Sequence, residues 1–176
     1  MNTWITLIDW ILFIPLAFCV GYLFFFAIAS RFQSHLIDRK FKPQKQHRFL
    51  VLFPAYKEDR VIISSVRSFL QQDYPQELFD IIVISDQMQD TTNDTLRSLP
   101  IRLLIADYKE SSKAKAMTMA MNAIKEEPYD VVAVMDADNL TSPDFLAEVN
   151  RAFDSGLQSI QAHRTGKNLN TAISVL

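Results

Sequence analysis

Residues 49–58 read Phe-Leu-Val-Leu-Phe-Pro-Ala-Tyr-Lys-Glu, an apolar run followed at once by a proline and then by polar side chains. A short run of this kind, without alternating polar residues, is typical of a strand that is buried on both faces. Three more such runs follow along the chain, at 81–84, 101–105 and 131–135. Together with 49–53 they predict four buried strands.

Helical patterns lie between and after these runs, at 59–72, 113–127 and 143–154. Ser142 and Pro143 predict the N-cap and first position of the third helix, and Gly156 predicts its end. Alternation of strand and helix indicates an α/β fold with a mainly parallel sheet, and a final strand is expected at 157–162. The apolar stripes expected to face the core are Ile62, Val66, Phe69 and Leu70; Ala114, Met117, Met121 and Ile124; and Phe145, Val149 and Phe153.

Upstream of the first strand, residues 10–30 contain no charged side chain. As a helix this segment is about 31 Å long, which is enough to cross the hydrocarbon core of a bilayer. A cleaved signal peptide would instead need a basic start and a shorter apolar stretch, whereas the only early charge is Asp9. The sequence therefore predicts one transmembrane helix.

The charges after this helix predict its orientation. Residues 31–48 hold six basic residues and one acidic residue, a net charge of +5. By the positive-inside rule, residues 1–9 are extracytoplasmic and the soluble part is cytoplasmic. The basic linker, 31–47, is either solvated or in contact with anionic lipid.

Composition excludes several kinds of site. The chain has three glycines in 176 residues, so it contains neither a Walker loop nor a G-x-G-x-x-G loop, and any phosphate must be held in another way. A net charge of −2 argues against nucleic acid as a partner. The single cysteine, Cys19, excludes an internal disulfide and a cysteine-based zinc site.

Polar residues follow three of the predicted strands. In open α/β sheets, ligands bind beyond the carboxyl ends of the strands. The first run is followed by 54–58, the second by Asp86, and the fourth by Asp136 and Asp138. Asp90, with Thr91 and Thr92, has the alternative role of capping a helix.

The aspartate pair is the strongest chemical signal. Asp136 and Asp138 are two residues apart, so in extended backbone both carboxylates project to one side and repel each other unless a cation lies between them. Mg²⁺ or Mn²⁺ would be held by such oxygens when a diphosphate completes the shell. The alternatives are a cap for the helix near Pro143 and a phosphoaspartate enzyme. Lys113 and Lys115, at the start of a helix, are either solvated or placed to meet an anion.

Taken in order, these segments resemble the donor-binding part of a family 2 glycosyltransferase with the nucleotide-diphospho-sugar transferase (GT-A) fold. The resemblance covers residues 48–176, and the mainly parallel sheet would be incomplete. The segments that carry it are 54–58, Asp86 with 90–92, 113–117, 136–138, and 161–164 with Lys167 and Asn168.

The resemblance implies a role for each matching residue. Pro54, Tyr56 and Glu58 would belong to the nucleotide site, with Tyr56 and Glu58 against the base and ribose, and Asp86 would bind the base. Lys113, or Lys115 if the register is shifted, would approach the base or the diphosphate. Asp138 would bind the metal directly, and Asp136 would bind the ribose or join the metal shell. The donor would be a nucleotide-diphospho-sugar of the UDP type, and the reaction would be inverting, for polysaccharide or glycolipid synthesis.

In this family the catalytic base and the acceptor-binding residues belong to a second half, so the base is expected beyond Leu176 and the sequence is interpreted as an N-terminal fragment or a truncated product. Two other hypotheses stay open at this point. One is a membrane-anchored module that binds a nucleotide sugar without turning it over, and the other is phosphatase chemistry at Asp136.

Overall fold

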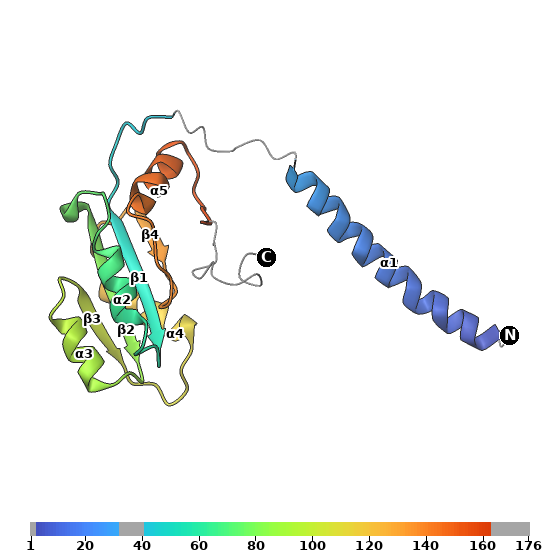
Figure 1. Cartoon of the computed structure of the whole chain (residues 1–176), viewed down its shortest axis with the longest axis horizontal. Helices are drawn as coiled ribbons and strands as arrows, with labels where there is room; N and C mark the ends of the chain where they lie inside the picture. Colours follow the sequence, from blue (N-terminus) through green and yellow to red (C-terminus); the bar gives the residue numbers. More distant parts are fainter. Residues whose placement is uncertain (1–2, 32–40, 163–176) are drawn as a thin grey trace, which may run out of the picture. The chain divides into compact units, whose positions relative to one another are not determined.

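The computed structural model of the protein describes residues 3–31 and 41–162. The chain divides into two compact units, Met1–Lys40 and Phe41–Leu176. The first contains helix α1 (Thr3–Arg31), and the second contains a four-stranded sheet with its helices. Figure 1 shows these elements in chain order.

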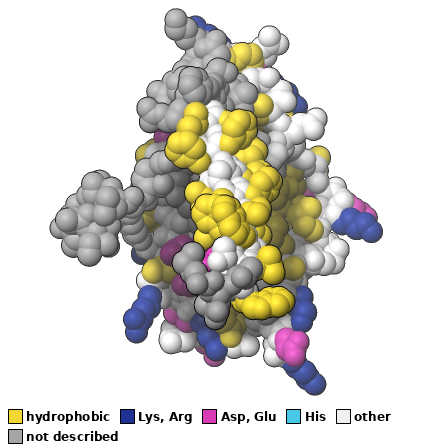
Figure 2. Space-filling model, turned by 90° about the vertical axis from the view of Figure 1, so that its right-hand side faces the viewer, with side chains coloured by type: hydrophobic (Ala, Val, Ile, Leu, Met, Phe, Trp, Pro, Cys, Tyr) yellow, Lys and Arg dark blue, Asp and Glu magenta, His cyan; other side chains and the backbone are white. Residues whose placement is uncertain are grey.

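Helix α1 is longer than the predicted span and begins seven residues before it. Its segment Thr6–Ala29 has a mean hydropathy of 2.5 and is long and apolar enough to cross a membrane. Its described large apolar side chains are exposed, and Figure 2 shows hydrophobic side chains gathered in a band on the face that it draws. Length and composition therefore agree with a membrane span, and a signal sequence would pass the same test.

The sheet is entirely parallel, in the order β3-β2-β1-β4. Its strands are β1 (Phe49–Tyr56), β2 (Phe79–Asp86), β3 (Arg102–Ala106) and β4 (Val131–Val134). All four predicted strands are therefore confirmed as strands. Burial on both faces is confirmed for β1 and β2 and is wrong for the edge strands β3 and β4, which expose Ile105, Val132 and Val134. β1 continues through Pro54. The backbone of Pro54 faces β4, as that of Leu52 does, but the ladder between β1 and β4 already stops at Leu52 and Val134. The missing N–H of Pro54 thus removes no ladder hydrogen bond.

Helices cover both faces of the sheet (Figure 1). Helices α2 (Ile62–Phe69), α3 (Asp90–Arg97) and α5 (Phe145–Asp154) pack on one face, against Phe49, Val51 and Phe53. Helix α4 (Lys113–Ala123) packs on the other face, against Leu50 and Leu52. A short 3₁₀ helix, η1 (Gln76–Leu78), leads into β2. Alternate residues of β1 thus enter two separate cores, which is why its sequence is apolar throughout.

The stripe predicted for α2 is confirmed, since Ile62, Val66 and Phe69 are buried and Leu70 packs beside them. The stripe predicted for α4 is confirmed only at Ile124, which is buried just after the helix. The buried residues of α4 itself are Ala116 and Ala120, whereas Ala114 is exposed and Met121 is 43% exposed. Small alanines let α4 lie close to the sheet, and the long methionine side chains remain at its margin.

Two predictions near the C-terminal end of the described domain are wrong. Helix α5 begins at Phe145, with Asp144 and not Ser142 at its N-cap. The carbonyls of Ser142 and Pro143 accept hydrogen bonds from Gln72 and Asp73, and this holds the two residues outside the helix. Residues 157–162 form no strand. Residues 158–162 line a groove of about 860 Å³ beside the edge of β4, together with the half-buried stripe Phe145, Val149 and Phe153.

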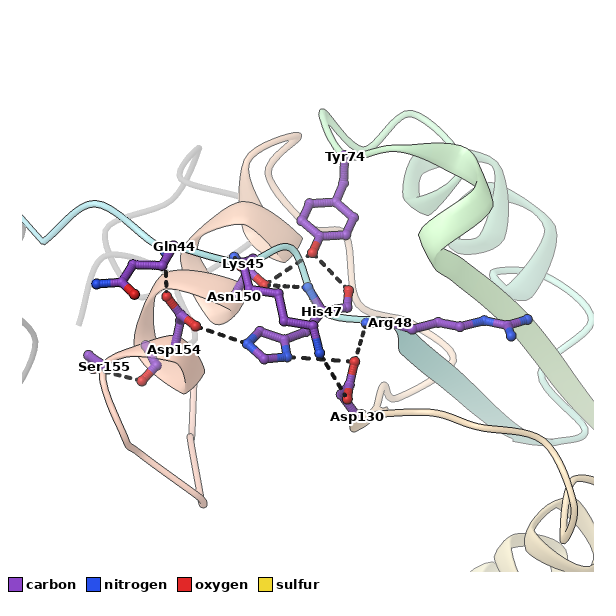
Figure 3. A network of polar contacts seen from close by, with 10 residues as sticks. Gln44, Lys45, His47, Arg48, Tyr74, Asp130, Asn150, Asp154 and Ser155 are labelled. Atoms are coloured by element: carbon purple, nitrogen blue, oxygen red, sulfur yellow. Dashed lines mark hydrogen bonds and ion pairs between the residues drawn. The ribbon is translucent and has the colours of Figure 1, made fainter.

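The end of the basic linker is fastened to the domain (Figure 3). The backbone N–H groups of Gln44 and His47 donate to Asp154 (2.6 Å) and Asn150 (2.9 Å) of α5. The His47 ring lies between Asp154 (Nε2 to Oδ1, 3.0 Å) and Asp130 (Nδ1 to Oδ2, 3.6 Å). Tyr74 donates to the His47 carbonyl at 2.8 Å. The residues just before β1 are therefore an ordered part of the domain.

Candidate active site at the carboxyl edge of the sheet

The register brings the ends of β1 and β2 together. Tyr56 is paired with Asp86, and the N–H of Lys57 donates to the Asp86 carbonyl at 3.1 Å. The next residue of each strand, Lys57 (φ 56°) and Gln87 (φ 53°), has left-handed backbone. This conformation costs a non-glycine residue free energy, and such residues cluster at functional sites. The chain thus turns sharply at two adjacent strand ends.

A polar cluster lies at these ends. The Asp86 side chain is 3% exposed and accepts a hydrogen bond from the Ser111 hydroxyl at 2.9 Å. The Gln87 amide lies between Ser111 (Nε2 to Oγ, 3.4 Å) and the Tyr56 hydroxyl (Oε1 to oxygen, 3.5 Å). The Tyr56 ring is 47% exposed, with the Lys57 ammonium 5.0 Å from its centroid. The cluster offers a planar aromatic surface beside a buried carboxylate, which suits a nucleoside.

A second group of charges lies at the end of β4. Lys113 Nζ, at the start of α4, is 2.5 Å from Asp136 Oδ1. Asp136 is partly buried, and Asp138 is exposed. The structure thus brings together two of the residues singled out in the sequence from segments 23 positions apart.

Lys115 has a different environment from Lys113. Its ammonium donates to the Glu110 carbonyl at 2.7 Å and lies 5.8 Å from the centroid of the Tyr108 ring. The Ser112 hydroxyl accepts from the Lys115 N–H and caps α4. Of the two lysines, Lys113 is therefore the one that contacts the aspartate pair.

The remaining predicted residues have simpler positions. Pro54 lies within β1, and Glu58 is exposed, with its carbonyl accepting the N–H groups of Val61 and Ile62. Asp90 lies in the first turn of α3, where Gln89 is the N-cap, so it does not cap the helix. Of the segment 161–164 with Lys167 and Asn168, only Gln161 and Ala162 lie within the described residues.

Sequence reasoning missed several polar residues of this edge. Gln87 and Ser111 join the two strand ends, but neither belongs to a recognisable motif. Asp59 accepts the Gln89 N–H at 2.9 Å, and hydrogen bonds from Thr92 and then Gln89 lower its pKa. The one available signal was the Ser111-Ser112 pair before a helix, which predicts a cap and not a contact with Asp86.

Within the described ranges, no three His, Cys, Asp or Glu side chains form a cluster that could hold a metal ion. Asp136 and Asp138 supply two hard carboxylates, which fits Mg²⁺ or Mn²⁺ only if a ligand contributes further oxygens. The interpretation of these aspartates as helix caps is wrong, because α5 begins with Asp144 at its N-cap.

A parallel sheet flanked by helices on both faces, with acidic residues at the carboxyl ends of β2 and β4, has the GT-A architecture of nucleotide-sugar transferases. The chain belongs to the glycosyltransferase-like family 2, whose profile matches residues 47–176. The resemblance found in the sequence is thereby confirmed. Membership of a transferase family also overturns the phosphoaspartate hypothesis.

Two curated relatives are similar to parts of the chain. A probable glycosyltransferase, YdaM, of Bacillus subtilis is 32% identical over 94 residues, which are 51% of this chain and 22% of the relative. The poly-β-1,6-N-acetyl-D-glucosamine synthase of Staphylococcus epidermidis is 23% identical over 142 residues, which are 76% of this chain and 32% of the relative. The similar region thus spans less than a third of each relative.

Two solved structures share the fold. The mannosyltransferase PcManGT of Pyrobaculum calidifontis, in complex with GDP-Man and Mn²⁺, has a TM-score of 0.58 at 23% identity, over 74% of this chain and 39% of that chain. S. aureus TarS 1-349 in complex with UDP has a TM-score of 0.54 at 17% identity, over 68% of this chain and 39% of that chain. At these identities the likeness establishes the architecture alone.

Proposed function

We propose that the chain is the donor-binding part of a membrane-anchored glycosyltransferase that moves a sugar from a nucleotide diphosphate to an acceptor hydroxyl. The observation that carries the proposal is the contact between Lys113 and Asp136, with Asp138 exposed beside them and the Tyr56–Asp86 cluster at the neighbouring strand ends. The nucleoside needs a surface like the Tyr56–Asp86 cluster, and the diphosphate needs a charged surface like that of Lys113 and the aspartate pair beside it. The ligands named for PcManGT and TarS support the same class of donor.

Each residue takes a role that follows from its position. Tyr56 stacks on the nucleoside, and Asp86, oriented by the Ser111 hydroxyl, accepts a hydrogen bond from it. The Lys113 ammonium pairs with the diphosphate, and Asp136 holds that ammonium in place. We assign Glu58, which is exposed just after β1, to the ribose.

Asp138, with Asp136, would hold a divalent cation, Mg²⁺ or Mn²⁺, through carboxylate oxygens. Such a cation offsets the charge that develops on the leaving diphosphate. The site residues of this chain bind and orient the donor, and we assign the deprotonation of the acceptor to a base outside the described residues. By family resemblance we propose an inverting reaction that serves polysaccharide or glycolipid synthesis.

We further propose that α1 spans the membrane and that the domain is cytoplasmic. The uncharged stretch of α1 and the basic residues that follow it support this orientation. Exposed Lys42 is available to anionic lipid, whereas Lys45 and Arg48 form ion pairs with Asp130 and Asp80.

Titration calorimetry of the full chain in detergent tests the donor site. We expect UDP or GDP to bind with Mn²⁺ and to bind at least tenfold more weakly with EDTA. Asp138→Ala should have the same effect as EDTA, whereas Asp144→Ala, an exposed aspartate six residues further on, should bind like the wild type. Equal affinity with Mn²⁺ and with EDTA would refute the metal-assisted site. Binding without release of sugar from UDP- or GDP-sugars would favour a module that binds the donor without turnover.

A further inference from the structure

Gln72 is a buried glutamine whose side chain forms hydrogen bonds with the segment that follows the aspartate pair and with the start of α5. It is 6% exposed. Its Nε2 donates to the Ser142 carbonyl (2.7 Å) and to Thr141 Oγ1 (3.3 Å), and its Oε1 accepts the N–H of Leu146 (2.9 Å). A carbonyl partner on one side and an N–H partner on the other allow only this orientation of the amide.

The segment that receives these bonds has no regular structure of its own. Residues 139–144 connect the aspartate pair to α5, and irregular segments are ordinarily the least stable parts of a domain. This one is held at two places. The N–H of Asn139 donates to the Asp136 carbonyl at 3.1 Å, and Gln72 donates to Thr141 and Ser142. Asp138 lies inside the turn that the first of these bonds closes, three residues before Thr141.

Gln72 is itself fixed by the core. It follows α2, and its N–H donates to the carbonyl of Phe69, a residue that is 1% exposed. The Phe69 ring packs against Phe53 of β1 (5.7 Å between centroids) and Phe145 of α5 (5.9 Å). The next residue, Asp73, donates its N–H to the Pro143 carbonyl at 2.7 Å. The contacts of Phe69 with the core therefore fix the end of α2, and the end of α2 in turn fixes the position of residues 141–143.

We propose that Gln72 is a positioning residue for the divalent-cation site, because it holds the segment that aims the Asp138 carboxylate. This inference rests on the proposed function, since it assigns the cation to Asp138. Residues that orient a metal ligand commonly change metal affinity by about 10- to 100-fold when they are replaced. The hydrogen-bond partners of Gln72, which are Phe69, Thr141, Ser142 and Leu146, include none of the residues assigned to the donor or the cation, so its replacement should leave binding of the bare nucleoside unchanged.

The test compares Gln72→Met with Gln71→Met in the full chain. Gln71 is the exposed neighbour, so the same chemical change is made one residue away from the contacts. Free Mn²⁺, followed by its electron paramagnetic resonance signal in the presence of UDP, gives the half-saturating concentration. We expect it to rise about tenfold in Gln72→Met and to stay unchanged in Gln71→Met. Uridine affinity without metal should be equal in both.

Hydrogen exchange of the ligand-free chain supplies a second readout. The amides of 139–146, Leu146 above all, should exchange faster in Gln72→Met, while those of β1 keep their protection. If this variant does not fold, Gln72→Glu takes its place, because it keeps the size of the side chain and the acceptor for Leu146 but loses both donors.

The outcomes separate the inference from the proposed function. Normal Mn²⁺-dependent UDP binding by the wild type, with an unchanged half-saturating concentration in the variant, overturns the role of Gln72 alone. A wild-type chain that binds no nucleotide with Mn²⁺ overturns the proposed function and this inference with it. A variant whose uridine affinity falls as much as its Mn²⁺ affinity contradicts the inference, because Gln72 would then support the whole edge and not the cation site.

Discussion

At the scale of single residues, two lysines in the same turn of α4 have different partners. Lys113 contacts the Asp136 carboxylate, whereas Lys115 contacts the Glu110 carbonyl and lies over the Tyr108 ring. Two residues of separation place them about 200° apart around the helix, so only one can face the carboxyl edge. Their sequence context, Lys-Ala-Lys-Ala, did not distinguish them.

This difference predicts the effect of removing each charge. Lys113→Met should weaken UDP binding by roughly 10- to 100-fold, since a hydrogen bond to a charged group contributes about 1.5–3 kcal/mol. Lys115→Met should change it less than about threefold, because that ammonium does not lie at the edge. Calorimetry with UDP and with uridine checks both. A loss of uridine binding in Lys113→Met would place Lys113 at the base and not at the diphosphate.

At the scale of elements, two carboxylates with lowered pKa values join the linker end to the rest of the domain: Asp154 joins it to α5, and Asp130 joins it to the start of β4 (Figure 3). The Arg48 N–H, and then Lys45 and His47, lower the pKa of Asp130. The Gln44 N–H, and then His47, lower the pKa of Asp154. A carboxylate with a lowered folded-state pKa stabilises the fold above its unfolded value, near 3.9, and this stabilisation is lost as the pH falls through the folded value.

Acidification should therefore weaken the junction, that is, the contacts of Asp130 and Asp154 with the end of the linker. We expect the free energy of unfolding to fall below about pH 4, and Asp130→Asn to reduce that pH dependence. At pH 7 the variant should lose no more than about 1 kcal/mol, because Asp130 is more than a third exposed and its ion pairs are screened. Urea unfolding from pH 7 to pH 3 measures both quantities. The control is Asp107→Asn, an exposed aspartate after β3; an equal change in the two variants would argue against the junction.

Helix α1 leads to a prediction about membrane attachment. Replacing Leu16 and Phe24 together by lysine should release the chain from the membrane, because a central lysine costs about 2.5–3.5 kcal/mol on insertion. The paired control is Gln71→Lys with Gln76→Lys, which adds the same charge to exposed positions of the domain. Extraction of membranes with alkaline carbonate separates the outcomes. Retention of the doubly substituted α1 would contradict a spanning helix.

At the scale of the whole molecule, the sequence predicted the architecture more closely than the details of the site. β1 and β2 were predictable because parallel strands buried on both faces need continuous apolar residues, which short-range patterns reveal. β3 and β4 are apolar as well, although they are the edge strands and expose Ile105, Val132 and Val134. Helix α3 was indicated only by the alternative that Asp90 caps a helix, and no apolar stripe predicted it, since its sequence, Asp-Thr-Thr-Asn-Asp-Thr-Leu-Arg, is polar and only Thr92, Asn93 and Leu96 of it are buried. Tertiary packing of those three residues outweighs a weak helical propensity.

By itself, the sequence determined that the chain combines one long apolar helix with a parallel α/β domain whose strand ends carry acidic residues. Only the tertiary structure decided which side chains meet there: Ser111 with Asp86, Lys113 with Asp136, and Gln72 with the segment after Asp138. Strand and helix patterns arise from contacts a few residues apart, and so they can be recognised along the chain. These three contacts join residues 23 to 70 positions apart, and only the packing of the sheet and its helices brings such residues within hydrogen-bonding distance.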